Sequence, residues 1–259
     1  MFDIKYPRFE KDMILKAEML ESIRDYPIDL FDAQYQRHSD GILSGVLLTV
    51  EDGTTIVVSK GVIKYKERIY CLPQEERFCG KPLGTEQMII VQFQEIKKDT
   101  TYTIYPAQIK IKEGITLEEN EMELGRFILK EGAVLRTDYT DLTDMATLHN
   151  TINIINVKYS GICEATLSVE ITHRFGVEMS KISLVDPVDI CFTMQCMQYQ
   201  VMQKVVIEQY VRYRLPTAAK GELNQRQLYD YLCMILEQTK NTPKRTGRMN
   251  QNNRRMMVD

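Results

Sequence analysis

Cysteine and histidine are the side chains of this 259-residue chain that could bind a metal ion or act in nucleophilic catalysis. A zinc site needs such residues two to four positions apart, or on one face of a helix. Cys191 and Cys196 come closest to that pattern, but on a helix their spacing places them about 140° apart around the axis. His38, His149 and His173 lie far apart in the sequence. We therefore expect no metal site, and we interpret the histidines as structural.

The six cysteines follow no spacing of the kind found in disulfide frameworks. The start of the chain lacks the apolar core of a signal peptide. We therefore expect reduced, partly buried thiols. They are Cys71, Cys79, Cys163, Cys191, Cys196 and Cys233.

Two glycine-containing segments and one acidic run come closest to other functional motifs. In residues 80–85 the lysine follows the wrong glycine for a phosphate-binding loop, and Pro82 removes an amide donor that the loop needs. In residues 41–45 the serine has the wrong spacing for a nucleophile elbow. The acidic run at 118–123 lacks the glycine of a calcium loop, and we interpret it as a solvated segment before a strand. These patterns predict neither a cofactor nor an enzymatic activity.

Charge is unevenly distributed along the chain. Residues 1–145 hold 19 Lys/Arg against 26 Asp/Glu, a net charge of −7, whereas residues 146–259 hold 14 against 10, a net +4. The overall charge of −3 argues against attraction of the whole protein to nucleic acid or to anionic membranes. No apolar run approaches the roughly 18 residues that cross a bilayer.

The positive surplus of the second half lies entirely beyond Lys240. A 19-residue tail with few large apolar groups is not expected to fold on its own. We expect it to dock on an acidic protein surface, with contact to nucleic-acid phosphates or a solubilising role as alternatives. Its cations are Lys244, Arg245, Arg248, Arg254 and Arg255. At the other end of the chain, Phe2, Tyr6 and Phe9 are expected to contact partners as well.

The elements that carry these residues change in character along the chain. Helical periodicity predicts a first helix over 13–26, which Pro27 ends or restarts, and a second short helix over 28–38. Residues 42–71 predict a meander of short strands, with turns at Asp52-Gly53 and at Lys66-Glu67.

A longer hairpin is predicted over 87–112, with its turn at 97–100 and with Pro106 marking an edge or bulge in the returning strand. A further strand at 124–132 brings the expected total to six to eight, mostly antiparallel.

Helices are expected from about Thr140. Asp186 can cap a helix that Pro216 closes, and residues 202–213 present one apolar face of that helix. Asn224 and Gln227 form a capping box for the last helix. Its inward face is predicted to be Leu228, Leu232, Ile235 and Thr239.

The patterns together predict an α+β fold. We expect an N-terminal arm with helices (1–40), an antiparallel β-domain (41–138), a helical C-terminal domain (139–240) and a basic tail (241–259).

Five stretches of the first 185 residues carry a family resemblance. They read FDIKYPRFEKDMILKAEML (2–20), YQRHSDGILSG (35–45), SKGVIKYKERIYCL (59–72), ELGRFILKEGAVLRTDY (123–139) and NTINIINVKYSGICEATLS (150–168). Their order resembles baseplate proteins of contractile phage tails and of phage-tail-like bacteriocins of the clostridial type.

The resemblance implies a structural baseplate component that joins the baseplate wedge to receptor-binding tail fibres, in several copies within a symmetric particle. It implies synthesis in the bacterial cytoplasm followed by incorporation into a virion or a tail-like particle, with no membrane partner. Three alternatives stay open: a soluble enzyme, a nucleic-acid-handling protein or a tail-assembly chaperone.

Overall fold

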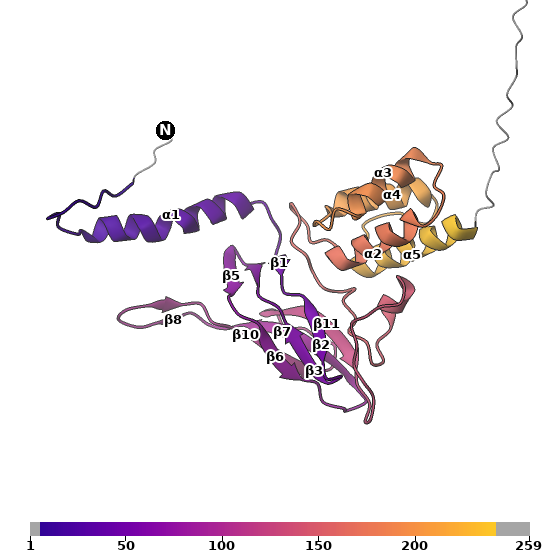
Figure 1. Ribbon diagram of the computed structural model, residues 1–259, viewed down its shortest axis with the longest axis horizontal. Coiled ribbons are helices and arrows are strands. Elements are labelled where there is room, and N and C mark those ends of the chain that lie inside the picture. Colours follow the sequence, from indigo (N-terminus) through magenta and orange to yellow (C-terminus); the bar gives the residue numbers. More distant parts are fainter. Residues whose placement is uncertain (1–5, 242–259) are drawn as a thin grey trace, which may run out of the picture.

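Residues 6–241 are described by the computed structural model, which is drawn in Figure 1. Antiparallel sheets form a β-body, four helices pack together on one side of it, and one long helix projects from the other side. The predicted α+β class is confirmed.

The β-body contains eleven strands in the described part of the chain, more than the six to eight expected. The excess comes from an unpredicted strand after the first hairpins and from two strands of only two residues. The strands are β1 (Gly41–Gly45), β2 (Leu48–Glu51), β3 (Thr55–Val58), β4 (Gly61–Tyr65), β5 (Arg68–Leu72), β6 (Glu76–Cys79), β7 (Glu86–Phe93), β8 (Lys97–Lys98), β9 (Thr103–Ile104), β10 (Ala107–Glu113) and β11 (Glu121–Ile128).

Both predicted tight turns are confirmed. β2 pairs with β3 around Asp52 and Gly53, and both residues have positive φ, as a turn of this hand requires. β4 pairs with β5 around Lys66 and Glu67, which adopt positive φ without a glycine. The prediction of a simple meander over 42–71 is wrong, because β1 pairs with β4 while β2 and β3 form a separate sheet with β6.

The long hairpin of β7 and β10 is confirmed, with Val91 opposite Ile109. Its turn lies further along than expected, because Lys97 and Lys98 form strand β8, which pairs with β9. The carboxylate of Asp99 accepts hydrogen bonds from the amides of Thr101 and Tyr102 and so shapes the turn itself. β11 completes the sheet β10-β7-β11, which packs against the sheet β1-β4-β5.

The first helix differs from the prediction. α1 (Ala17–Tyr35) is a single helix that continues through Pro27. Proline removes one backbone hydrogen bond and crowds the preceding turn. The good helix formers that follow it, including Leu30 and Gln34, keep the last two turns helical.

Regular helices begin later than the expected Thr140. Apart from the short 3-10 helix η1 (Thr143–Ala146), residues 139–168 run irregularly along the β-body and bridge to it at two points of β11 and at Ile42 of β1. The stretch 152–157 carries four buried apolar residues, and these attach this segment to the β-body. The buried residues of the β-body and of the helices form one continuous core.

Four helices follow: α2 (Val169–Ser180), α3 (Pro187–Cys196), α4 (Lys204–Arg214) and α5 (Gln225–Asn241). Asp186 caps α3, and Asn224 and Gln227 exchange the two hydrogen bonds of a capping box, as predicted. The prediction of a single helix from Asp186 to Pro216 is wrong, because a loop separates α3 from α4. The predicted apolar face over 202–213 is only partly inward, because Tyr210 is buried whereas Val206 and Tyr213 are exposed.

Candidate partner-binding surfaces

The arm, defined as residues 6–35, lies outside the packed body. It consists of an extended stretch at 6–16 and of α1, and no residue of α1 is buried. Figure 1 shows α1 projecting from the body, which it joins through its C-terminal end. Its exposed large apolar side chains are Tyr6, Phe9, Met13, Ile14, Leu15, Leu20, Ile23, Tyr26, Ile28, Leu30 and Phe31.

The side chains of α1 separate into two faces. At 3.6 residues per turn, the five carboxylates fall within about 80° of arc. They are Glu18, Glu21, Asp25, Asp29 and Asp32. An apolar stripe of Met19, Ile23, Tyr26 and Leu30 occupies about 60° on the opposite side. With one arginine, Arg24, the net charge of α1 is −4.

Packing of the apolar face supplies most of the stability of an amphipathic helix in a protein, and Pro27 further weakens α1 on its own. Within the arm, Tyr6 lies 6.4 Å from Tyr26 between ring centroids, so the extended stretch folds back beside α1. The described chain offers little else to cover the apolar stripe, so α1 has the character of a docking element.

Lys64 of β4 anchors the arm to the β-body. Its side chain is only 7% exposed, and Nζ donates hydrogen bonds to the carbonyl oxygens of Tyr35 (2.7 Å) and His38 (2.5 Å). A cation at this end of α1 satisfies terminal carbonyls and opposes the negative end of the helix dipole. Ser39 continues the attachment, because its carbonyl accepts from the hydroxyl of Ser160 at 2.6 Å.

His38 belongs to this anchor. Burial lowers the pKa of His38, and the nearby charge of Lys64 lowers it further. The ring is therefore neutral near pH 7. Its face-to-edge contact with Tyr35, at 5.1 Å between centroids, holds the turn that follows α1.

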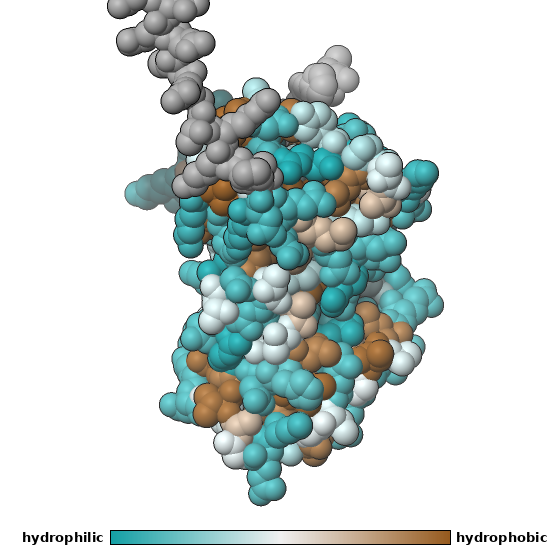
Figure 2. Space-filling model, turned by 90° about the vertical axis from the view of Figure 1, so that its right-hand side faces the viewer, coloured by the Kyte–Doolittle hydropathy of each residue, from teal (hydrophilic) through white to brown (hydrophobic). Residues whose placement is uncertain are grey.

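A second apolar surface lies on α3 and is named here the outer face of α3. It consists of Val188, Ile190, Cys191, Met194 and Met197, all exposed. The inward side of the same helix packs through Phe192, whose ring stacks on Tyr210 at 3.8 Å. α3 therefore has large apolar side chains on both its inward and its outward side, although a surface helix normally presents polar residues to solvent. Figure 2 shows brown apolar patches among the teal residues of the upper part of the molecule.

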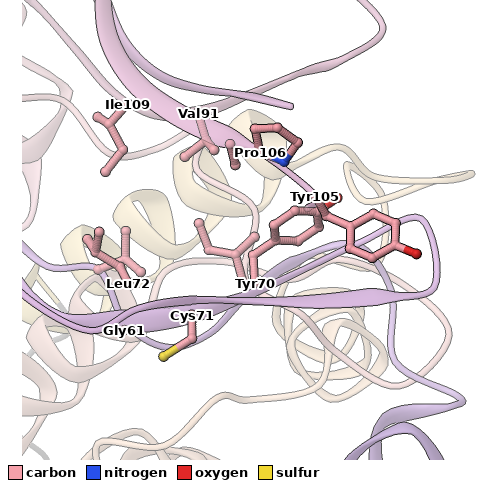
Figure 3. Close-up of a pocket in the computed structure, with 11 residues that line it drawn as sticks. Gly61, Tyr70, Cys71, Leu72, Val91, Tyr105, Pro106 and Ile109 are labelled. Atoms are coloured by element: carbon pink, nitrogen blue, oxygen red, sulfur yellow. The ribbon is translucent and has the colours of Figure 1, made fainter. Parts of the chain in front are cut away.

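A third feature is a cavity of about 310 Å³ between the sheets β1-β4-β5 and β10-β7-β11, named here the side groove (Figure 3). Figure 3 shows Leu72 and Tyr70 of β5 on one side of it, with Val91 and Ile109 on the other. Tyr105 lies at its rim, where the guanidinium of Arg68 stacks 3.7 Å from the ring centroid.

Polar groups gather in another pocket, of about 360 Å³, beside the N-terminal half of α2. Burial raises the pKa of Glu170, and the nearby Arg174 only partly offsets this. Tyr139 lines the same pocket, but its hydroxyl already donates to the carbonyl of Ile152 at 2.6 Å. Sequence reasoning missed Glu170, since no motif distinguishes it from the other acidic residues. The pocket contains no nucleophile paired with a base among its lining residues.

The predicted partner-contact residues fall into two groups. Tyr6 and Phe9 lie on the arm and are exposed. The others lie outside the described residues: Phe2, Lys244, Arg245, Arg248, Arg254 and Arg255.

The cysteines are free thiols, and the expectation of partial burial is wrong for most of them. Cys71, Cys79, Cys163 and Cys191 are exposed, whereas Cys196 is buried and Cys233 is half-buried. Cys191 and Cys196 do lie on one helix, α3. Over residues 6–241, no three metal-ligating side chains come together. No helix in that range is long and apolar enough to span a membrane.

The acidic run at 118–123 is not uniformly solvated as expected. Glu121 and Glu123 are buried in β11. Lys112 contacts Glu121 at 2.6 Å, and Arg126 contacts Glu123 at the same distance. Burial acts to raise the pKa of Glu121, but hydrogen bonds from Lys112 and from the Glu118 amide outweigh it and lower that pKa.

No protein-family model matches the chain, and no curated protein matches its sequence. Among solved structures, the chain is similar to TssK, with a TM-score of 0.39 and 9% identity over 91% of this chain and 68% of that chain. It is similar to a chain of the TssK-TssF-TssG baseplate subcomplex of the type VI secretion system, with a TM-score of 0.44 and 7% identity over 92% of this chain and 100% of that chain.

A chain of the type VI secretion baseplate complex gives a TM-score of 0.36 and 8% identity, over 91% of this chain and 100% of that chain. These neighbours are components of a baseplate. The TM-scores are too low to establish a common fold, so the role of the chain rests on its own residues and surfaces.

Proposed function

We propose that the protein is a structural component of the baseplate of a contractile particle, where it joins the baseplate wedge to receptor-binding fibres. The observation that carries the proposal is the arm, a helix with an apolar stripe that the described chain leaves largely uncovered. A helix of this kind gains its stability from a partner. The contractile particle is inferred from the five stretches of sequence that resemble baseplate proteins of contractile phage tails.

An adaptor needs at least two separate docking surfaces. The arm projects from one side of the β-body, and the outer face of α3 belongs to the helices on the other side (Figure 1). The two surfaces also differ in chemistry, because α1 is acidic whereas the outer face of α3 has no charged side chain. Charge depletion is typical of the buried centre of a permanent interface.

The proposal predicts that the chain is present in the finished particle and that the arm holds it there. Ile23→Asp combined with Leu30→Asp places two charges on the apolar stripe of α1. We expect this variant to be lost from purified particles, while the melting temperature of the isolated protein changes little, because the stripe packs on no part of the body. Particle content is measured by mass spectrometry of sedimented particles, with electron microscopy to verify contractile tails.

A matched control is Val134→Asp, which alters an exposed apolar residue of the β-body away from the arm. It should be incorporated normally. A chain that accompanies unfinished tails but is missing from finished ones would instead be an assembly chaperone. A chain found with neither would refute the structural role.

A further inference from the structure

The side groove is the open flank of the β-body. β5 is the outermost strand of the sheet β1-β4-β5, and β10 is the outermost strand of the sheet β10-β7-β11. Both strands border the groove, and β10 has no strand pairing on its outer edge within the described chain. An unpaired strand edge next to exposed apolar side chains is a template for an added strand.

The chemistry of the groove favours an extended apolar segment. Its lining is almost entirely apolar, and Leu72 and Ile109 are only half-buried although they point into it. Alternate side chains of an added strand would enter the groove while its backbone pairs with β10. The two sheets already contact each other deeper in the body, where Tyr65 stacks on Phe93 at 3.7 Å between centroids. An added segment would therefore cover the outer part of the groove, where the two sheets do not contact each other.

The arm contains a segment of this kind directly before α1. Residues 13–16, Met-Ile-Leu-Lys, belong to no helix or strand, and the backbone of Lys16 is extended. Ile14 is 81% exposed, which makes it the most exposed large apolar side chain of the described chain. Met13 and Leu15 are exposed as well.

This segment does not occupy the groove of its own chain, because no residue of the arm is among those that line it. The 19 residues of α1 separate the segment from Tyr35, which Lys64 holds at the β-body, and a helix of that length spans about 28 Å. The groove of a second copy is therefore the better partner for it. Charge agrees with this assignment: residues 61–72 and 97–113, on both sides of the groove, hold seven Lys/Arg against three Asp/Glu, whereas α1 has a net charge of −4.

We propose that residues 13–16 of one copy add as a strand to β10 in the side groove of a second copy, with the acidic face of α1 lying beside the basic flanks of the groove. The contact is head-to-tail, so it closes into a ring if the rotation between copies permits. It goes beyond the adaptor role, because it concerns copies of this chain alone and holds in the purified protein.

Crosslinking of the purified protein tests the contact, because Cys71 lies on β5 at the border of the groove, with its sulfur on the other face of the strand from Tyr70 and Leu72 (Figure 3). Ile14→Cys is introduced into a chain with Cys79, Cys163 and Cys191 changed to serine, and a flexible bismaleimide long enough to reach around β5 is added. We expect covalent dimers and higher species that disappear when Cys71 is also changed to serine. Ile28→Cys, at an exposed position of α1 outside the segment, is the matched control and should crosslink far less.

A second measurement uses Ile14→Asp in the native sequence. Since Ile14 packs on no part of the body, this change leaves the fold intact, and a weaker association cannot be attributed to unfolding. Burial of an isoleucine side chain is large enough that association should weaken by about tenfold or more in light scattering over a concentration series. Crosslinking at Ile14→Cys no stronger than at Ile28→Cys, crosslinks within one chain, or a native protein that stays monomeric would each overturn the proposal. None of these outcomes depends on whether the chain enters a baseplate.

Discussion

Lys64 connects two parts of the chain that are otherwise barely in contact. Its ammonium group is buried and donates to the carbonyls that end α1. Lys64→Met keeps the aliphatic volume but leaves these acceptors without their donor, at a cost of about 1–3 kcal/mol for buried groups. We expect α1 to loosen from the β-body and trypsin to cut faster after Arg37, as followed by mass spectrometry.

Lys60→Met is the control, because Lys60 is an exposed lysine in the turn that leads into the same strand. It should leave the cleavage rate at Arg37 unchanged. Equal rates in both variants would show that Lys64 does not hold the arm.

Glu170 is expected to lower stability at neutral pH. Because burial raises its pKa, the folded protein binds a proton here more tightly than the unfolded chain does. The protonated Glu170 therefore adds to the free energy of unfolding below the ordinary glutamate pKa. This contribution is lost as the pH rises through the raised pKa that Glu170 has in the folded protein. Glu170→Gln should raise the Tm at pH 7, and the gain should shrink as pH falls toward the ordinary glutamate range.

The control is Glu131→Gln, at an exposed position beyond β11. Thermal melts of both variants and the native protein across this pH range check the prediction. A gain at Glu170 that does not depend on pH would contradict it.

The buried acids of β11 show why single residues are hard to assign from sequence. Glu121 and Glu123 alternate with apolar residues, as solvated strand residues do. Their burial depends on the pairing of β10 and β11 with β7, which places Lys110 and Lys112 beside Glu121. Those partners come from a strand whose register the local pattern does not define.

Pro27 limits the helicity of the arm. Proline in a helix interior is about 3 kcal/mol less favourable than alanine. Pro27→Ala should therefore strengthen α1, which circular dichroism at 222 nm and slower amide exchange in α1 would detect. The main unfolding transition should not move, because α1 buries no residue against the body.

Pro7→Ala lies in the extended stretch of the arm and should change neither signal. A rise in the Tm of the whole protein with Pro27→Ala would mean that α1 unfolds together with the body.

The elements that the sequence predicted well have local causes. Asp52 and Gly53 define their hairpin by turn chemistry alone, and Asn224 with Gln227 defines the start of α5. The irregular path of 139–168 has no such local signal, because its apolar residues are held by bridges to β11. The break between α3 and α4 was missed for a similar reason: Met202 continues the helical spacing across a loop.

The docking surfaces were only partly predictable. Tyr6 and Phe9 stood out as aromatic residues near the start of the chain. Helical periodicity predicts the helix that carries the apolar stripe of α1, but it does not tell whether the surface that an amphipathic helix covers belongs to its own chain. The division at residue 138 stays a prediction, and a continuous core runs from the β-body into the helices.

We expect the basic tail (241–259) to dock on an acidic protein surface. Replacing Arg245, Arg248, Arg254 and Arg255 with serine removes most of its charge. We expect slower and less salt-sensitive incorporation into the particle and a nearly unchanged Tm, because rim charges act mainly on association rate and on its salt dependence. Sedimentation of particles at several salt concentrations measures this. Normal incorporation at ordinary ionic strength would leave the tail with a solubilising role only.

The projection of α1 from a single attachment point makes it a lever. A helix of 19 residues is about 28 Å long, so a tilt of roughly 10° at Lys64 moves its far end by about 5 Å. Small adjustments in the few bonds between Tyr35 and Ser39 thus become large changes in reach. One subunit could then meet neighbours at different spacings with the same side chains, and stiffness at this joint, more than affinity at the tip, would determine which spacings it accepts.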